Sequence, residues 1–359
     1  NCFHNVLCLS KAKGMDIKMK KIETKDAVGH VICHDITIIV KDQIKDTAFR
    51  KGHIVREEDI PKLLSIGKDH LYVWEKEEGM LHENEAAEIL ASVCESAYMK
   101  RSPVKEGKIE LSATQRGLFQ IDLEKLSAIN ELEDIMIASR HHNQPVNVGD
   151  KLVGTRVIPL VISEEKMKQV KEIGGKEPLF RILPYKRKTA GVVTTGNEVY
   201  YGRIQDTFTP VIREKLKAYD VEVLVHKTVP DKREKIVEAI REIKGKGVDM
   251  VLCTGGMSVD PDDMTPSAIK ESGAQIISYG APVLPGAMFL LGCFSDGTPV
   301  IGLPGCVMYA RATIFDLLLP RILADVPITK KDLAKMGAGG LCLGCDICTY
   351  PNCGFGKGV

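Results

Sequence analysis

Hydrophobic and polar positions repeat in a strand–helix order over residues 187–326. Short apolar runs of strand length, such as Thr189–Thr194 (TAGVVT), alternate with segments whose apolar residues recur every three to four positions. The expected strands are Thr189–Thr194, Val221–Val229, Val248–Cys253, Met288–Phe294 and Pro299–Leu303. This order is typical of parallel sheets with crossover helices, so we expect an α/β, doubly wound, mostly parallel domain with three α/β/α layers.

Capping residues mark where the helices of this domain should begin. A Ser or Thr hydroxyl at the N-cap accepts a hydrogen bond from a free N–H group of the first helical turn, and a following proline holds φ near its helical value. An acidic residue three positions after the N-cap accepts the backbone N–H of the N-cap residue. Met308–Leu323 is expected to form a largely apolar closing helix. The predicted helix starts are Thr209 with Pro210, Asp231 with Glu234, and Thr265 with Pro266.

Residues 15–180 carry a mixed pattern, which predicts an α+β region of one or two subdomains before the α/β domain. The stretch Gly174–Lys188 is rich in Gly, Pro and basic residues and is the expected linker. We interpret residues 1–14, which begin without Met, as an artefact or a disordered leader. The expected β segments are Val31–Val40, Leu71–Trp74 and Asn147–Ile162, and the expected helices are Glu57–Ile66 and Asn84–Tyr98.

Composition narrows the classes of partner. The 359 residues carry a net charge of +1, so there is no positive field to attract nucleic acid or an anionic membrane. The apolar run Ala287–Phe294 is far shorter than the roughly 20 residues that span a bilayer. We therefore expect a cytoplasmic protein with no nucleic-acid or membrane partner, and we also expect a homo-oligomer.

Glycine-rich loops follow the predicted strands. The third strand runs into TGGMSVDPDDM, residues 254–264, where two adjacent glycines would let phosphate oxygens approach the backbone. The acids Asp260, Asp262 and Asp263 in this loop could hold Mg²⁺ on those oxygens, or they could simply favour the positive end of a helix. The other loops are TTGNEV (194–199) and two Leu-Pro-Gly turns, at 284–286 and 303–305, and all four should converge on one crevice.

The order TTGNEV, GRIQD, TGGMSVDPDDMTP, LPGAM and GLPG resembles the molybdenum-cofactor biosynthesis domain of molybdopterin molybdotransferases, molybdopterin adenylyltransferases and competence/damage-inducible proteins. In that family molybdopterin is joined to AMP from Mg-ATP, or the adenylate is hydrolysed as molybdate is inserted. The resemblance implies Asp263, Asp206 and Glu198 as catalytic acids. It also implies ligand contacts at Thr195, Gly196, Thr254, Gly255, Gly256, Ser258, Pro285, Gly286, Pro304 and Gly305.

The resemblance therefore predicts a transferase that uses Mg²⁺, molybdopterin or its adenylate, molybdate, and in one reaction ATP. Molybdotransferases usually carry lysines around the third loop and Asn-Pro after the last Pro-Gly, whereas this chain reads LPGAM and Gly305-Cys306-Val307. A non-catalytic molybdopterin carrier or sensor, docking a molybdoenzyme or another cofactor-assembly protein, is the alternative. Hydrolysis of a nucleotide such as ADP-ribose is a third. Cys253 and Cys306 lie near two loops and are read as packed thiols rather than nucleophiles.

The C-terminal residues 337–359 hold Cys342, Cys345, Cys348 and Cys353 in a C-x2-C-x2-C-x4-C pattern. Four thiolates so close in sequence are a strong metal-ligand signal. Consecutive x2 gaps favour an iron–sulfur cluster, whereas structural Zn²⁺ more often uses two separated C-x2-C pairs. Both metals remain open, and this tail is not part of the family that the preceding domain resembles.

Overall fold

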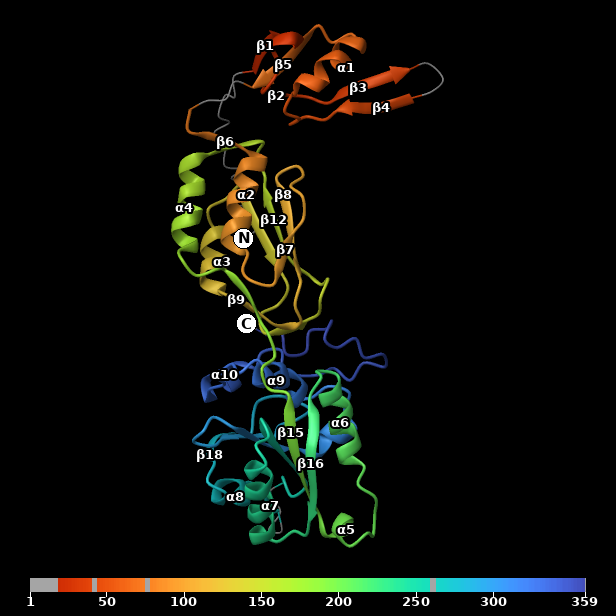
Figure 1. The fold of residues 1–359 in the computed structure, drawn as a ribbon, viewed down its shortest axis with the longest axis vertical. Helices are drawn as coiled ribbons and strands as arrows, with labels where there is room; N and C mark the ends of the chain where they lie inside the picture. Colours follow the sequence, from red (N-terminus) through yellow and green to blue (C-terminus); the bar gives the residue numbers. More distant parts are fainter. Residues whose placement is uncertain (1–18, 41–43, 75–77, 259–262, 359) are drawn as a thin grey trace, which may run out of the picture.

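The computed structural model describes residues 19–40, 44–74, 78–258 and 263–358. It is elongated, with three units in chain order along its long axis (Figure 1). Each unit has a hydrophobic core: one over residues 27–73, one over residues 86–182, and two around the sheet of the third unit. The expected leader, residues 1–14, lies outside the described residues.

The first unit is a small α+β fold whose Ile32, Leu63 and Leu71 side chains are almost fully buried. Antiparallel strands β1, β5 and β2 form one sheet, and β3 and β4 form a hairpin. The elements are β1 (Met19–Glu23), η1 (Thr24–Asp26), β2 (Val31–Ile32), β3 (Ile36–Val40), β4 (Ile44–Phe49), η2 (Glu57–Asp59), α1 (Ile60–Ser65) and β5 (His70–Trp74).

The second unit packs helices α2, α3 and α4 against antiparallel sheets in the orders β10-β12-β8-β7 and β11-β9-β14. The Phe119 and Phe180 rings stack in its core with their centroids 5.6 Å apart. The elements are β6 (Met80–His82), α2 (Glu83–Cys94), β7 (Met99–Arg101), β8 (Lys108–Ala113), β9 (Gly117–Ile121), α3 (Leu123–Asn130), β10 (Ile135–Ser139), β11 (Gln144–Val146), β12 (Lys151–Val157), β13 (Val161–Ser163), α4 (Glu164–Gly174) and β14 (Phe180–Leu183).

The third unit has a six-stranded sheet in the order β16-β15-β17-β20-β19-β18. The first four strands are parallel, and β19 runs antiparallel to both of its neighbours. The strands are β15 (Thr189–Thr195), β16 (Glu222–Val229), β17 (Met250–Thr254), β18 (Gln275–Tyr279), β19 (Leu290–Cys293) and β20 (Pro299–Leu303).

Helices cover both faces of this sheet. One core joins α6 and α9 to the sheet, and the other joins α7 and α8 to the opposite face, so the predicted mostly parallel, three-layer α/β/α fold is confirmed. The third unit's helices are α5 (Asn197–Tyr200), α6 (Phe208–Lys217), α7 (Arg233–Gly245), α8 (Thr265–Glu271), η3 (Gly305–Met308), α9 (Ile314–Leu323) and α10 (Lys330–Lys335).

Several expected boundaries are wrong. The closing helix begins only at Ile314, where Thr313 caps it, because Gly305–Met308 forms a separate 3-10 turn. The expected linker Gly174–Lys188 contains β14, which pairs with β9 of the second unit. Helix α2 ends at Cys94, earlier than expected. Strand β18 was not expected at all; its half-buried residues pair only with β19, at the sheet edge.

The predicted helix caps also differ. The Asp206 carboxylate, not Thr209, accepts the first N–H groups of α6. Asp231 lies before α7 and instead accepts the N–H of Asn197, 2.8 Å away. Thr265 is the first residue of α8, and its hydroxyl donates to the Gly255 carbonyl. Asp231 and Thr265 therefore each support a neighbouring loop, whereas Asp206 caps α6.

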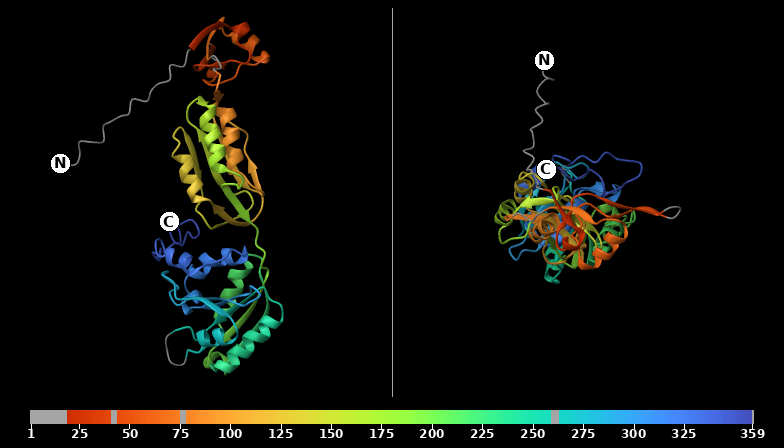
Figure 2. Two further views of the ribbon diagram at one scale, coloured as in Figure 1. Left: turned by 90° about the vertical axis from the view of Figure 1, so that its left-hand side faces the viewer. Right: turned by 90° about the horizontal axis from the view of Figure 1, so that it is seen from above.

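Arg116 ties the second unit to the third. Its guanidinium donates to the Asp220 carboxylate at 2.8 Å and lies 5.4 Å from the centroid of the Tyr219 ring. The C-terminal segment up to Gly358 also lies between these two units (Figure 2) and lines a cavity with residues of both. No helix in the described ranges has the length and apolar character needed to cross a membrane.

Candidate functional site

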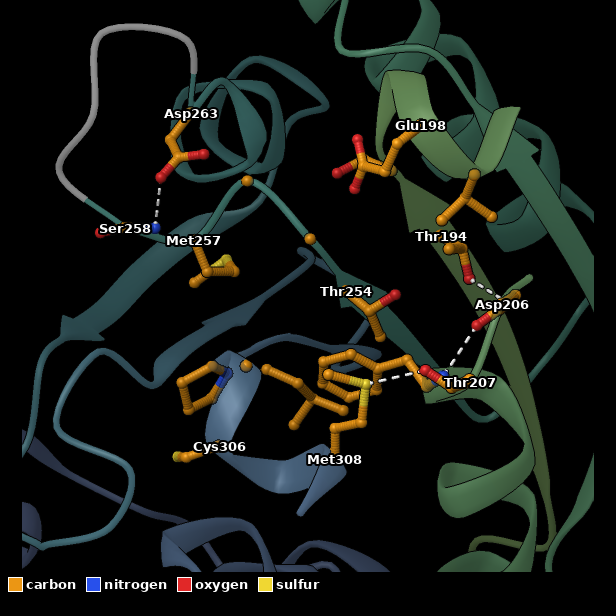
Figure 3. Close-up of a pocket in the computed structure, with 18 of the residues that line it drawn as sticks. Thr194, Glu198, Asp206, Thr207, Thr254, Met257, Ser258, Asp263, Cys306 and Met308 are labelled. Atoms are coloured by element: carbon orange, nitrogen blue, oxygen red, sulfur yellow. Dashed lines mark hydrogen bonds between the residues drawn. The ribbon is translucent and has the colours of Figure 1, made fainter. Parts of the chain in front are cut away.

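A pocket of about 720 Å³ opens at the carboxyl ends of three neighbouring parallel strands (Figure 3). Thr195 ends β15, Thr254 ends β17 and Leu303 ends β20, and all three line it. Open α/β sheets bind ligands at this edge because the loops that leave parallel strands gather there. Three of the four expected glycine loops therefore meet in one cavity.

Two glycines shape the loop that follows β17. Gly255 and Gly256 have φ angles of 83° and 53°, in the region that favours glycine. A Cβ atom at Gly255 would collide with the carbonyl oxygen of Thr195. The loop can therefore lie directly against the end of β15 only if this residue is glycine, which leaves backbone groups free to face a ligand.

The Thr254 hydroxyl is the least satisfied polar group of the pocket. Its side chain is 0% exposed, and its Oγ1 has no hydrogen-bond partner among the described residues. By contrast, the hydroxyl of Thr265 donates to the Gly255 carbonyl at 2.8 Å. A buried hydroxyl without a partner costs about 1 to 3 kcal/mol, so a polar ligand atom at this position would remove that cost.

Asp206 lines the pocket but is fully engaged by protein groups. One carboxylate oxygen accepts the N–H groups of Phe208 and Thr209, and the other accepts the Thr209 hydroxyl at 2.5 Å. Burial raises the pKa of Asp206, but these hydrogen bonds and nearby His226 outweigh it and hold the pKa below its ordinary value. Asp206 therefore stays ionised and anchors the start of α6.

Glu198 and Asp263 lie on opposite sides of the pocket (Figure 3). Asp263 accepts the N–H of Ser258 at 2.7 Å through one oxygen, which closes the base of the loop after β17. Glu198 is exposed on the short helix α5. Among the described lining residues there are three carboxylates, with Asp206, and no Lys, Arg or His. An anionic ligand would therefore need a cation beside it.

Most predicted ligand residues lie where expected, with three exceptions. Pro285 lines a different cavity, and a Cβ at Gly286 would come 2.5 Å from the Ile314 side chain, so neither lines this pocket. Gly196 lies next to Thr195 but not among the lining residues. The predicted residues that do line it are Thr195, Glu198, Asp206, Thr254, Gly255, Gly256, Ser258, Asp263, Pro304 and Gly305.

Sequence reasoning missed a polar cluster behind the pocket. The imidazole Nε2 of His226 on β16 lies 3.0 Å from the Thr194 hydroxyl and 3.2 Å from the Thr209 hydroxyl. Burial lowers the pKa of His226 more than the nearby carboxylate of Asp206 raises it. The one available signal was a lone histidine inside a β-rich run, which is too common to indicate a cluster.

Sulfur-containing side chains also line the pocket, and the sequence pointed only to Cys306 among them. Met257, Met288 and Met308 contribute apolar surface, and the Thr207 hydroxyl donates to the Met308 sulfur at 3.1 Å. Cys306 lines the pocket too, and burial raises the pKa of its thiol, so it is protonated at neutral pH. Cys253 is fully buried in β17 with its thiol pKa raised to about 12.

The four tail cysteines all line a second cavity, of about 530 Å³. Within the described part of the chain, no three ligand-type side chains stand close enough together to hold a metal ion. The predicted metal role of Cys342, Cys345, Cys348 and Cys353 therefore stays a prediction.

Parts of this chain are similar in sequence to known proteins. Residues 191–324 match the family described as "Probable molybdopterin binding domain", and residues 21–75 match a domain of unknown function. A molybdopterin molybdenumtransferase of Staphylococcus epidermidis is 22% identical over 306 residues, which is 81% of this chain and 68% of that protein. A CinA-like protein of Mycolicibacterium vanbaalenii is 42% identical, over 21% of this chain and 18% of its own length.

Among solved structures, the molybdopterin biosynthesis enzyme MoaB of Thermus thermophilus is 27% identical, over 37% of this chain and 91% of its own, with a TM-score of 0.34. A molybdenum cofactor biosynthesis protein of Pyrococcus furiosus is 14% identical, over 88% of this chain and 66% of its own, with a TM-score of 0.27. The described lining residues of the pocket all fall within the matched residues 191–324. The pocket therefore lies in the part of the chain that matches the molybdopterin-binding domain family.

Proposed function

We propose that this protein binds adenylated molybdopterin in the pocket at the ends of β15, β17 and β20 and catalyses Mg²⁺-dependent molybdate insertion. The unpartnered hydroxyl of Thr254 carries the proposal, because it is a buried polar group without a partner among the described residues, in the cavity of a molybdopterin-binding domain. The choice of reaction rests on the match to molybdenumtransferases, which extends over 81% of the chain, well beyond the domain itself.

The charges of the pocket support a requirement for Mg²⁺. A phosphate group here would meet three carboxylates and no cation from the described lining residues. Asp263 or Glu198, which lie on opposite sides of the pocket, would hold the metal together with phosphate oxygens, since both oxygens of Asp206 already accept hydrogen bonds. Carboxylates are the ligands that Mg²⁺ uses together with phosphates. When bound, the metal would neutralise the negative charge that develops on the phosphate oxygens.

The protein's own groups would orient the ligand. Thr254 would donate to, or accept from, a polar atom of the ligand, and the Gly255-Gly256 turn would bring backbone groups against the phosphate. Asp263 would also keep the loop closed through the Ser258 N–H. These contacts would fix the adenylate for attack by water on its phosphoanhydride, which breaks the bond to AMP and leaves the phosphate on molybdopterin, without a side-chain nucleophile.

A turnover assay tests this reaction. The full-length protein would receive adenylated molybdopterin, Mg²⁺ and molybdate, and we expect release of AMP together with molybdenum incorporation. Asp263→Asn should lower kcat by roughly a hundredfold or more, since it removes charge at the reacting phosphate. Asp296→Asn is the matched control, because Asp296 lies in a turn outside the pocket and pairs with Lys244.

Three results would reject molybdate insertion. AMP transfer from Mg-ATP to molybdopterin, without hydrolysis of the adenylate, would assign the adenylyltransferase reaction. Tight pterin binding without either turnover would assign a carrier or sensor. Hydrolysis of ADP-ribose without any pterin would assign a nucleotide pyrophosphatase, the branch suggested by the 42% identity to a CinA-like protein over 77 residues.

A further inference from the structure

The C-terminal tail is a docked element of the third unit. The Phe355 side chain is 5% exposed in the core that α9 and the sheet share, and the Tyr350 hydroxyl donates to the Asp316 carbonyl at 2.9 Å. At the other end, the N–H of Cys342 donates to the Leu284 carbonyl at 2.8 Å. The segment that carries the cysteines is therefore held at both ends.

Between these two anchors the chain has no helix or strand. Leu343 and Ile347 are 83% and 79% exposed, so the middle of the segment is not packed into a core. All four cysteines are free thiols and line the same cavity of about 530 Å³. A segment with fixed ends and an unpacked middle can close around a ligand in that cavity.

We propose that Cys342, Cys345, Cys348 and Cys353 bind a cubane iron–sulfur cluster. The thiols of these residues would each exchange a proton for a bond to iron. No three of the thiols among the described residues stand close enough to share one metal ion, but a cubane does not need this, because each of its four thiolates binds a different iron. Three cysteines at consecutive x2 gaps fit a cubane, whereas tetrahedral zinc sites use C-x2-C pairs set further apart.

The cavity also shares its walls with the candidate ligand pocket. Residues 285–288 and 309–312 each contribute to both: Pro285 and Ala310 line the cysteine cavity, whereas Met288 and Tyr309 line the pocket. The Arg311 guanidinium reaches the Asp346 carbonyl at 3.5 Å, between two of the cysteines. A bound cluster would therefore stiffen two walls of the pocket. This coupling, unlike the cluster itself, rests on the proposed function.

Anaerobic purification of the full-length protein, with reconstitution by a mixture of Fe²⁺, Fe³⁺ and sulfide that supplies both oxidation states of iron in the cluster, tests the proposal. We expect a brown protein with about four iron and four sulfide ions per chain and a reducible cluster in electron paramagnetic resonance. Cys345→Ser should lose most of the iron and the signal. Cys293→Ser should keep the iron and the paramagnetic signal, because Cys293 is a partly buried thiol outside the cavity. The melting temperature of this variant shows how much the loss of a thiol alone affects stability.

Stoichiometric zinc with no bound iron would overturn the cluster, as would iron that Cys345→Ser retains. Misfolding of the variant is checked by circular dichroism, and Cys348→Ser provides a second test of the same ligand set. The coupling predicts that the clusterless protein binds molybdopterin severalfold more weakly; equal affinity would overturn it. If neither form binds molybdopterin, the proposed function fails, while the iron and sulfide content still decides the cluster.

Discussion

The Thr254 side chain is buried in the wall of the pocket with a hydroxyl that no described group satisfies. Thr254→Val keeps the shape of the side chain and removes the unsatisfied group, so we expect the unliganded protein to gain about 1 kcal/mol of unfolding free energy. Molybdopterin affinity should fall about tenfold, because one ligand hydrogen bond is lost. Denaturant unfolding and ligand titration measure the two effects.

Thr265→Val is the control for stability. Its hydroxyl donates to the Gly255 carbonyl, so this substitution leaves a partly buried acceptor unpaired and should destabilise the protein. The opposite signs of the two stability changes distinguish an unpartnered hydroxyl from a structural one. Unchanged ligand affinity in Thr254→Val would show that the hydroxyl is not a ligand contact.

His226 gives the stability of the third unit a dependence on pH. Burial holds the pKa of His226 below its ordinary value of about 6.5. As pH falls below that value, the unfolded chain takes up a proton that the folded protein resists, so folding stability decreases. Asp206, whose pKa is also lowered, adds a further loss only below about pH 4, where the unfolded carboxyl is protonated.

We therefore expect His226→Asn to make stability less sensitive to pH between about 6.5 and 5. Urea unfolding of both proteins at several pH values measures how steeply the unfolding free energy changes with pH in each. The difference between the two slopes removes the contribution of the other histidines, because both proteins contain them. Parallel pH profiles would contradict the assigned pKa shift.

At the scale of elements, the turn after β17 depends on the close approach of two strand ends. Gly255→Ala places a methyl group against the Thr195 carbonyl, so we expect a loss of about 3 kcal/mol or more and loss of ligand binding. Gly297→Ala is a matched control, because Gly297 has a φ of 85° but nothing within 4 Å of the added Cβ. It should cost about 1 to 2 kcal/mol and leave binding intact. Similar losses for both would contradict the role of close approach.

The tail is the second element whose contribution can be measured. Phe355→Ala removes a buried ring from the core and should cost about 3 to 5 kcal/mol. Leu343→Ala, at an exposed position of the same tail, should change stability by less than about 0.5 kcal/mol. Calorimetric melting of metal-free protein checks both, and a Phe355→Ala protein as stable as the control would show that the tail does not dock without metal.

At the scale of the whole molecule, the sequence predicted what depends on local pattern. Apolar runs located the parallel strands, and the order of glycine loops located the pocket, because parallel strands bring their carboxyl ends together whatever the loops contain. Contacts between distant segments were not predictable in this way. Pro285 and Gly286 repeat the turn at Pro304 and Gly305, yet only the second pair lines the pocket. The first turn supports the tail instead.

The sequence did not predict the edge strand β18 or the hydrogen-bonding roles of Asp206 and Asp231, for a related reason. β18 has half-buried residues that pair with β19 alone, so its sequence shows no continuous apolar run. Asp206 and Asp231 form hydrogen bonds that depend on where neighbouring loops lie. The second unit was predicted least, since its antiparallel strands pair across connections of varied length.

Molybdopterin binding in the pocket should require Mg²⁺ held by carboxylates, because no cation among the described lining residues can replace the metal. The decisive experiment is a fluorescence titration of molybdopterin into the full-length protein, with Mg²⁺ and with excess chelator. We predict saturable binding with Mg²⁺ that weakens at least tenfold with chelator, and the same weakening with Mg²⁺ present in Asp263→Asn. Equal affinity with and without Mg²⁺, or the absence of binding in both, would contradict this requirement.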